Sequence, residues 1–109
     1  MYPFGYTYPI FTVRLTEHFQ EWLDGLRDRR AQIRIVARLR LAEVGNLGDW
    51  KPVGGEVSEM RVDVGAGYRL YFTRSASVII VMLAGGNKST QSADIRRARR
   101  ILEQLELER

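Results

Sequence analysis

Arg61, Arg69 and Lys88 are the residues whose types and spacing are best suited to chemistry, namely the binding of a phosphate. Arg61 and Arg69 lie on either side of the glycine-containing segment 65–67, so a hairpin there would put them on adjacent antiparallel strands. Cross-strand and diagonal neighbours approach to about 5–8 Å, which lets two guanidinium groups converge on one phosphate. Lys88 follows two glycines at a predicted helix start, where free backbone N–H groups also favour an anion.

The same basic residues also have purely structural interpretations. Arg61 would pair with Glu59 or Asp63 on a solvated sheet face, and Lys88 would be a solvated lysine in a polar turn. The segment 85–89 resembles a phosphate-binding loop only superficially. It lacks the spacing of a Walker motif, and nucleoside triphosphate binding is therefore rejected.

A second group of candidates would contact nucleic acid. Lys51 beside Trp50 would hold a phosphate while the indole stacks on a base; the alternative is a tryptophan that anchors its loop to the core. Arg96 belongs to a cluster of arginines at 96–100, and further arginines occur along residues 27–38. These arginines are interpreted as solvated faces paired with acidic residues, or as electrostatic guidance toward a polyanion.

Hydrophobic periodicity predicts the elements that position these residues. Strands are predicted at residues 8–15, 57–64, 68–73 and 78–83, and helices from Thr16, at 28–44, and from Ser89 or Thr90. Residues 45–56, with four glycines and a proline, are predicted to form a loop. The predicted apolar stripe of the helix at 28–44 consists of Ile33, Val36, Ala37, Leu41 and Val44.

The strand patterns predict how the elements pack. Alternation places Arg61 and Arg69 on the sheet face opposite the apolar side chains of their strands. Residues 78–83 are apolar without alternation, which is typical of a central strand covered on both faces. The order β-α-α-β-β-β-α predicts a single small α+β domain over residues 1–109, with a mostly antiparallel sheet and helices packed on one face of it. Residues 1–7 are predicted to be an irregular lead-in.

Composition narrows the chemistry that is open to the chain. It has 109 residues, a net charge of +4 and an isoelectric point near 9.8, in the direction expected for a nucleic-acid partner. The absence of cysteine excludes disulfides, thiolate metal ligands and thiol catalysis. His18 is the only histidine, a poor basis for a zinc site or a Ser-His-carboxylate triad, so neither metal nor cofactor is expected. Without a membrane span or signal peptide, a cytoplasmic protein is expected.

Four segments, at residues 19–28, 45–54, 57–72 and 85–91, together resemble the RelE/ParE superfamily of bacterial toxins. More narrowly, they resemble its Gp49-like, HigB-type "addiction module killer protein" branch. The resemblance extends from about Thr12 to Leu105 and rests on the four segments in that order, on the predicted layout. It implies a ribosome-dependent endonuclease that cuts mRNA in the ribosomal A site. It also implies a cognate helix-turn-helix antitoxin that forms a hetero-oligomer with the toxin.

The resemblance also implies roles for single residues. Arg69 matches the arginine of a Gly-Tyr-Arg motif that grips the scissile phosphate, and Arg61 matches a basic position on the preceding strand. Lys88 falls where such toxins place a further cation after the last strand. Lys51 belongs to the Gly-Asp-x-Lys-Pro motif of the branch. Cleavage would then be independent of metal, with the 2′-hydroxyl attacking the adjacent phosphate.

One departure from the family pattern leaves alternatives open. Several ribosome-dependent members carry a tyrosine or histidine near the C-terminus as acid or base, and residues 90–95 contain neither. Acid–base work would then fall to Lys88, Asp94 or Lys51, or to no side chain of the protein. The alternative functions are a ParE-like toxin that inhibits DNA gyrase without nuclease activity, and a non-toxic basic module that binds nucleic acid.

Overall fold

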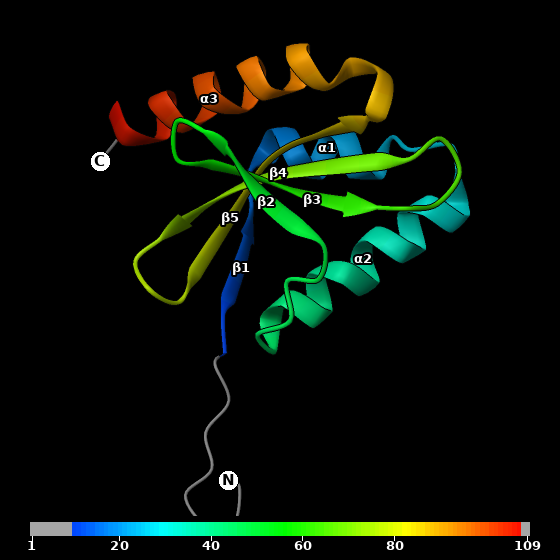
Figure 1. Ribbon diagram of the computed structural model, residues 1–109, viewed down its shortest axis with the longest axis horizontal. Helices are drawn as coiled ribbons and strands as arrows, with labels where there is room; N and C mark the ends of the chain where they lie inside the picture. The colour runs from blue at the N-terminus through cyan, green and yellow to red at the C-terminus, as the bar shows by residue number, and fades with distance from the viewer. Residues whose placement is uncertain (1–9, 108–109) are drawn as a thin grey trace, which may run out of the picture.

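Figure 1 shows the computed structural model, which describes residues 10–107 of the chain. The elements are β1 (Thr12–Leu15), α1 (Glu17–Asp24), α2 (Arg29–Glu43), β2 (Trp50–Gly54), β3 (Val57–Val62), β4 (Tyr68–Ser75), β5 (Ile79–Asn87), the 3-10 turn η2 (Lys88–Thr90) and α3 (Gln91–Leu107). The strands form one five-stranded sheet in the order β1-β5-β4-β3-β2. Only the β1–β5 pair is parallel, so the predicted α+β class with a mostly antiparallel sheet is confirmed. The predicted lead-in at 1–7 lies outside the described residues.

Side-chain caps begin the first two helices. The Phe19 N–H donates to Thr16 Oγ1 at 3.1 Å, which confirms Thr16 as the N-cap of α1. Asp28 caps α2 in the same way, through a 3.1 Å bond from the Ala31 N–H. The Thr16 hydroxyl also donates to the Leu83 carbonyl at 3.1 Å. This bond ties the start of α1 to the middle of the sheet.

The helices cover both faces of the sheet. The core on the α1 and α2 side contains Met60, Leu70 and Phe72, as the alternation predicts, and the core on the α3 side contains Tyr71 and Leu83. The prediction that all helices pack on one face is therefore wrong, and Figure 1 shows α3 and α2 on opposite sides of the sheet. The reason is that β5 carries apolar residues on both of its faces, and α3 is needed to cover the second one.

The segment predicted as a loop at 45–56 contains a strand. β2 pairs antiparallel with β3, with Trp50 opposite Met60 and Lys51 opposite Glu59. Pro52 lowers the strand signal because proline cannot donate to a ladder, but β2 is an edge strand, where one side needs no donor. A register shift between Pro52 and Gly54 accommodates the irregular end of the strand.

The α2 helix buries a different stripe from the predicted one. Its buried residues are Ala31, Ile35, Leu39 and Ala42. Four members of the predicted stripe (Ile33, Val36, Leu41 and Val44) are exposed instead. The helix has two apolar faces. The face with Ala31 and Ala42 is the one that is buried, because these small side chains let the helix approach the sheet closely. Within residues 10–107, no other element covers the second apolar face.

The glycines before Lys88 lie inside β5, which runs past its predicted end to Asn87. A Cβ atom on Gly85 would lie 2.3 Å from the Trp22 ring, and one on Gly86 would lie 1.8 Å from Asp94 Oδ2. Both distances are far below van der Waals contact. The two glycines therefore make room for Trp22 on one face of the sheet and for Asp94 on the other.

Candidate anion-binding site

The two arginines predicted to bind phosphate are direct cross-strand neighbours. Arg61 on β3 is opposite Arg69 on β4, and Lys51, Glu59 and Tyr71 lie opposite one another across β2, β3 and β4. Cross-strand partners project from the same face of a sheet, and Tyr71 belongs to the core on the α3 side. The fold thus brings Lys51, Arg61 and Arg69 onto one face, beside α3.

Glu59 lies between the two guanidinium groups. Its Oε2 is 3.5 Å from Arg61 Nε, and its Oε1 is 3.9 Å from Arg69 Nε. The Glu59 side chain is 3% exposed, against 41% for Arg61 and 17% for Arg69. No other hydrogen bond or ion pair of these two guanidiniums involves residues 10–107. The buried carboxylate therefore accepts a hydrogen bond from Arg61 Nε, but it only pairs by charge with Arg69 Nε, which is buried and has no hydrogen-bond partner within residues 10–107. Within the same residues no contact occupies the Nη groups of either arginine, which leaves them available to an anion.

Tyr71 and Asp94 complete the buried floor of the site. Burial raises the pKa of Tyr71 well above its usual range, the charges of Glu59 and Asp94 raise it further, and Arg69 opposes the shift. The tyrosine therefore keeps its proton. The Asp94 carboxylate lies over Gly86, the cross-strand partner of Arg69 on β5. It accepts hydrogen bonds from the Thr90 hydroxyl and, at 2.8 Å, from Arg97 Nη1, so its oxygens are already engaged.

Lys88 is placed near the arginines by the turn between β3 and β4. Its backbone N–H donates to the Gly67 carbonyl at 2.9 Å, and its Cδ lies 3.4 Å from where a Cβ of Gly67 would be. Gly67 precedes Arg69 by two residues and has a φ of +76°, which a side chain would strain. The side chain of Lys88 is exposed, so its ammonium group extends from the rim of the site. The next backbone N–H, that of Ser89, is bonded to Asn87 Oδ1 at 2.9 Å and is not free for an anion.

Two of the predicted contacts lie apart from this cluster. Trp50 packs on the opposite face of the sheet, with its ring 6.1 Å from that of Phe72 and Arg74 5.9 Å above it. It is therefore not beside the ammonium group of Lys51, although the two residues are adjacent in sequence. Arg96 is exposed on α3, two positions after buried Asp94, which places it on the outward side of the helix.

Arg38 of α2 supports the site from the other face of the sheet. Its guanidinium donates to the carbonyls of Arg61 and, at 3.0 Å, of Leu47. Burial lowers the pKa of Arg38, while the nearby Asp49 raises it. A Cβ on Gly48, whose φ is +63°, would lie 2.7 Å from Arg38 Nη2. The interpretation of Arg38 as part of a solvated face is thus wrong, because it holds the loop before β2 against the backbone of Arg61.

Sequence reasoning gave Glu59 only as a partner for Arg61 and gave no role to Tyr71. The available signal was their position, since each lies two residues from a candidate arginine and so on the same strand face. Across residues 10–107, no group of three or more His, Asp or Glu side chains is arranged to hold a metal ion. Within the same part of the chain, no helix is long and apolar enough to cross a bilayer.

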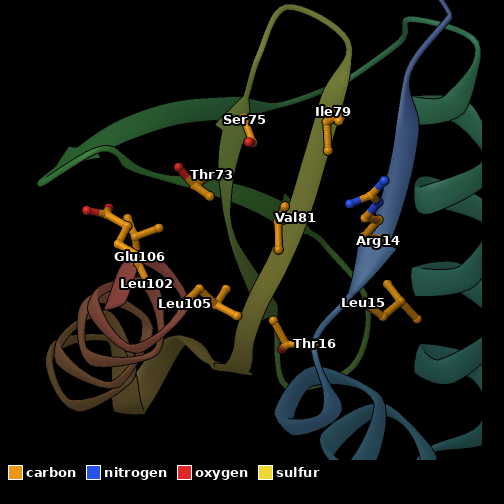
Figure 2. Close-up of a pocket in the computed structure, with 10 residues that line it drawn as sticks. All are labelled: Arg14, Leu15, Thr16, Thr73, Ser75, Ile79, Val81, Leu102, Leu105 and Glu106. Atoms are coloured by element: carbon orange, nitrogen blue, oxygen red, sulfur yellow. The ribbon is translucent and has the colours of Figure 1, made fainter. Parts of the chain in front are cut away.

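A separate hollow of about 320 Å³ opens farther along the α3 face (Figure 2). Its floor includes Val81 of β5, and Arg14 of β1 and Glu106 of α3 lie on opposite sides of it. None of the predicted phosphate ligands lines this hollow. The arginine pair is thus a surface site on the sheet rather than part of this hollow.

Comparison with known proteins supports the fold. No family model matches the chain. An uncharacterized protein of Haemophilus influenzae is 39% identical to it over 95 residues, which cover 87% of this chain and 96% of that protein. Among solved structures, a mutant of the E. coli toxin RelE in the free state is similar, with a TM-score of 0.60. That match covers 81% of this chain and 97% of the RelE chain at 14% identity, and it shows a RelE-like fold.

Proposed function

We propose that this chain, which belongs to the same family as the uncharacterized Haemophilus influenzae protein and has a RelE-like fold, is the toxin of a type II toxin–antitoxin module. More specifically, we propose that it is a HigB-type, ribosome-dependent mRNA endonuclease that inhibits translation. The observation that carries it is the Arg61–Arg69 pair, held by one buried carboxylate on an open sheet face. The proposed partners are the ribosome with its mRNA, and a cognate antitoxin.

The arginine pair suits stabilisation of a phosphorane-like transition state. In the proposed reaction the 2′-oxygen bonds to the adjacent phosphorus, the bond from phosphorus to the 5′-oxygen breaks, and a 2′,3′-cyclic phosphate forms. The extra negative charge lies on the non-bridging oxygens, to which Arg61 and Arg69 would donate from Nη groups that have no partner within residues 10–107. Because the Glu59 carboxylate forms an ion pair with each guanidinium, at 3.5 Å and 3.9 Å, both cations are already gathered at the site when that charge develops.

The proton transfers are assigned by exposure and by existing contacts. Lys88, on the rim, would donate a proton to the departing 5′-oxygen, and the 2′-hydroxyl would lose its proton to water. Asp94 is assigned a structural role, because its carboxylate already bonds Thr90 and Arg97. Lys51, exposed on the edge strand, would hold a neighbouring phosphate. The site therefore offers few acid–base groups, which is consistent with an enzyme whose substrate is oriented by the ribosome.

The test is induced expression of the chain in a bacterial host, with a growth curve and primer extension on abundant mRNAs. New 5′ ends within translated frames, together with growth arrest, are expected for the wild-type protein. We expect Arg69→Ala to lower the cleavage rate by about 10²–10³, the usual cost of removing one donor to the transition state. Arg100→Ala is the matched control, because Arg100 is exposed on α3 and has no ion pair with a site residue within residues 10–107.

Other outcomes would point to the alternative functions. Arrest with intact mRNA and DNA-damage signalling would indicate the gyrase-inhibiting class. The absence of arrest would favour a non-toxic module that binds nucleic acid. Cleavage by Arg69→Ala at the wild-type rate would refute the assigned site while leaving the nuclease activity standing.

A further inference from the structure

The outward face of α2 has no covering element within residues 10–107, and the proposed catalytic site does not use it. We infer that this outer face binds an amphipathic helix with acidic flanks, supplied by the antitoxin. The outer face comprises Arg29, Arg30, Ile33, Arg34, Val36, Ala37, Arg40, Leu41 and Val44. The identity of the partner rests on the proposed function, whereas the chemistry of the surface is independent of it.

The first observation is an exposed apolar stripe, which only Arg40 interrupts. Ile33 is 60% exposed, Val36 37%, Leu41 44% and Val44 58%. They recur over three turns on one side of the helix, along a rise of about 16 Å. A helix face that stays in water normally carries polar residues, and α2 already buries its other face against the sheet. The length and period of the stripe fit three turns of a second helix packed along it.

The second observation is a hollow at one end of the stripe. It measures about 280 Å³ and lies between α1 and α2, with Leu23, Ile33 and Val36 in its wall. Gln32 also lines it and is fixed by a 3.0 Å bond from its Nε2 to the Leu23 carbonyl. Interfaces draw much of their affinity from a large side chain seated in such a pocket. One leucine or phenylalanine of the partner would serve as this anchor.

The third observation is the positive charge on and beside the stripe. Arg29, Arg30, Arg34 and Arg40 are all exposed, and none forms an ion pair within residues 10–107. The expectation that these arginines pair with acidic residues of the chain is thus not met for this face. Two copies of so basic a surface would repel each other, whereas Glu and Asp on the flanks of a partner helix would complement it. The chemistry therefore favours an acidic helix over a second copy of this chain.

The outer face and the catalytic arginines are on opposite sides of the sheet. The Arg61 and Arg69 side chains lie on the α3 face, and α2 packs on the other. The bound helix would therefore leave the arginine pair uncovered. Substitutions on the outer face of α2 and substitutions at the arginine pair are expected to act independently, whereas Arg38, on the inner side of α2, contacts the Arg61 backbone.

The test titrates the full-length protein into a synthetic 21-residue helical peptide. The peptide has leucines at positions a and d and glutamates at positions e and g of each heptad. Its binding is followed by fluorescence anisotropy. We expect saturable binding, a loss of at least tenfold in affinity for Ile33→Asp, and unchanged affinity for Arg61→Ala and for Val78→Asp. Val78 is the matched control, since it is 50% exposed in the turn after β4. Far-ultraviolet circular dichroism would verify folding, and Ile33→Ser replaces Ile33→Asp if the latter unfolds.

Three results would overturn the inference. The first is equal binding by Ile33→Asp and wild type, and the second is equal binding of a peptide with lysines in place of the glutamates. The third is a dimer of the wild-type protein that Ile33→Asp abolishes, because the occupant would then be a second copy. Failure of the proposed function would look different: the chain would neither arrest growth nor cut mRNA, while the acidic peptide still bound to α2.

Discussion

Substituting Gly86 by alanine tests the contact between β5 and α3 that forms the floor of the candidate site. A Cβ there would lie 1.8 Å from Asp94 Oδ2, 2.6 Å from its Cγ and 3.0 Å from Thr90 Oγ1. Ordinary contact needs more than 3 Å, so the Asp94 carboxylate must move by more than 1 Å. Asp94 is only 4% exposed, so it cannot move into water without shifting the start of α3.

The cost of Gly86→Ala follows from what the carboxylate loses. Overpacking a closed site costs about 1–3 kcal/mol. The hydrogen bonds from Thr90 and Arg97 weaken as well, and we discount the Arg97 bond because that side chain is 41% exposed. Alanine also lowers the conformational entropy of the unfolded chain relative to glycine, which offsets the loss of folding stability by about 0.4–1 kcal/mol. We therefore expect the free energy of unfolding to fall by about 2–4 kcal/mol.

The assay is urea unfolding of wild type, Gly86→Ala, Asp94→Ala and the double variant. Asp94→Ala removes the atoms that clash, so the double variant should be nearly as stable as Asp94→Ala alone. The coupling free energy should then nearly equal the cost of Gly86→Ala, about 2–4 kcal/mol, because the two sites are in contact. Strict additivity of the two substitutions, or a loss below about 0.5 kcal/mol for Gly86→Ala, would refute the steric reasoning.

Two further predictions concern the same buried floor. Glu59→Gln removes the charged acceptor of Arg61 Nε and the ion-pair partner of buried Arg69, and should lower the free energy of unfolding by about 1–2 kcal/mol. It should at the same time tighten binding of a short RNA, because one negative charge is removed; weaker RNA binding would contradict the assigned role. For Tyr71, whose ordinary pKa is 10.0, the folded state holds the proton more tightly than the unfolded state. The free energy of unfolding should therefore fall as the pH rises above about 10. In parallel urea titrations, Tyr71→Phe should show a smaller fall than the wild-type protein. Identical pH profiles of the two proteins would contradict this reasoning.

Local patterns in the sequence were sufficient to predict the arginine pair. The alternation of β3 and β4 and the short turn at 65–67 predict that Arg61 and Arg69 share a face, and the observed register confirms this. The cap at Thr16 is also a local signal, since its hydroxyl bonds an N–H three residues away. Such features depend on strand period and on contacts within a few residues, which the order of amino acids specifies directly.

Where two local structures are equally compatible with the sequence pattern, the pattern alone could not show which one forms. The α2 helix has two apolar faces, and only packing against the sheet shows that Ile35 is buried and Ile33 is exposed. β2 carries glycine and proline that argue against a strand, and its pairing with β3 outweighs them because an edge strand tolerates proline.

The contacts that shape the site join residues far apart in the chain. Arg38 reaches the carbonyl of Arg61, and Asp94 fills the space that Gly86 leaves open. Glu59 is within two residues of Arg61, but its contact with Arg69 depends on strand register. Residue type and period thus specify which side chains line each strand face. Long-range packing specifies which charged side chains come into contact, because the distances between residues far apart in the chain are not encoded in any local pattern.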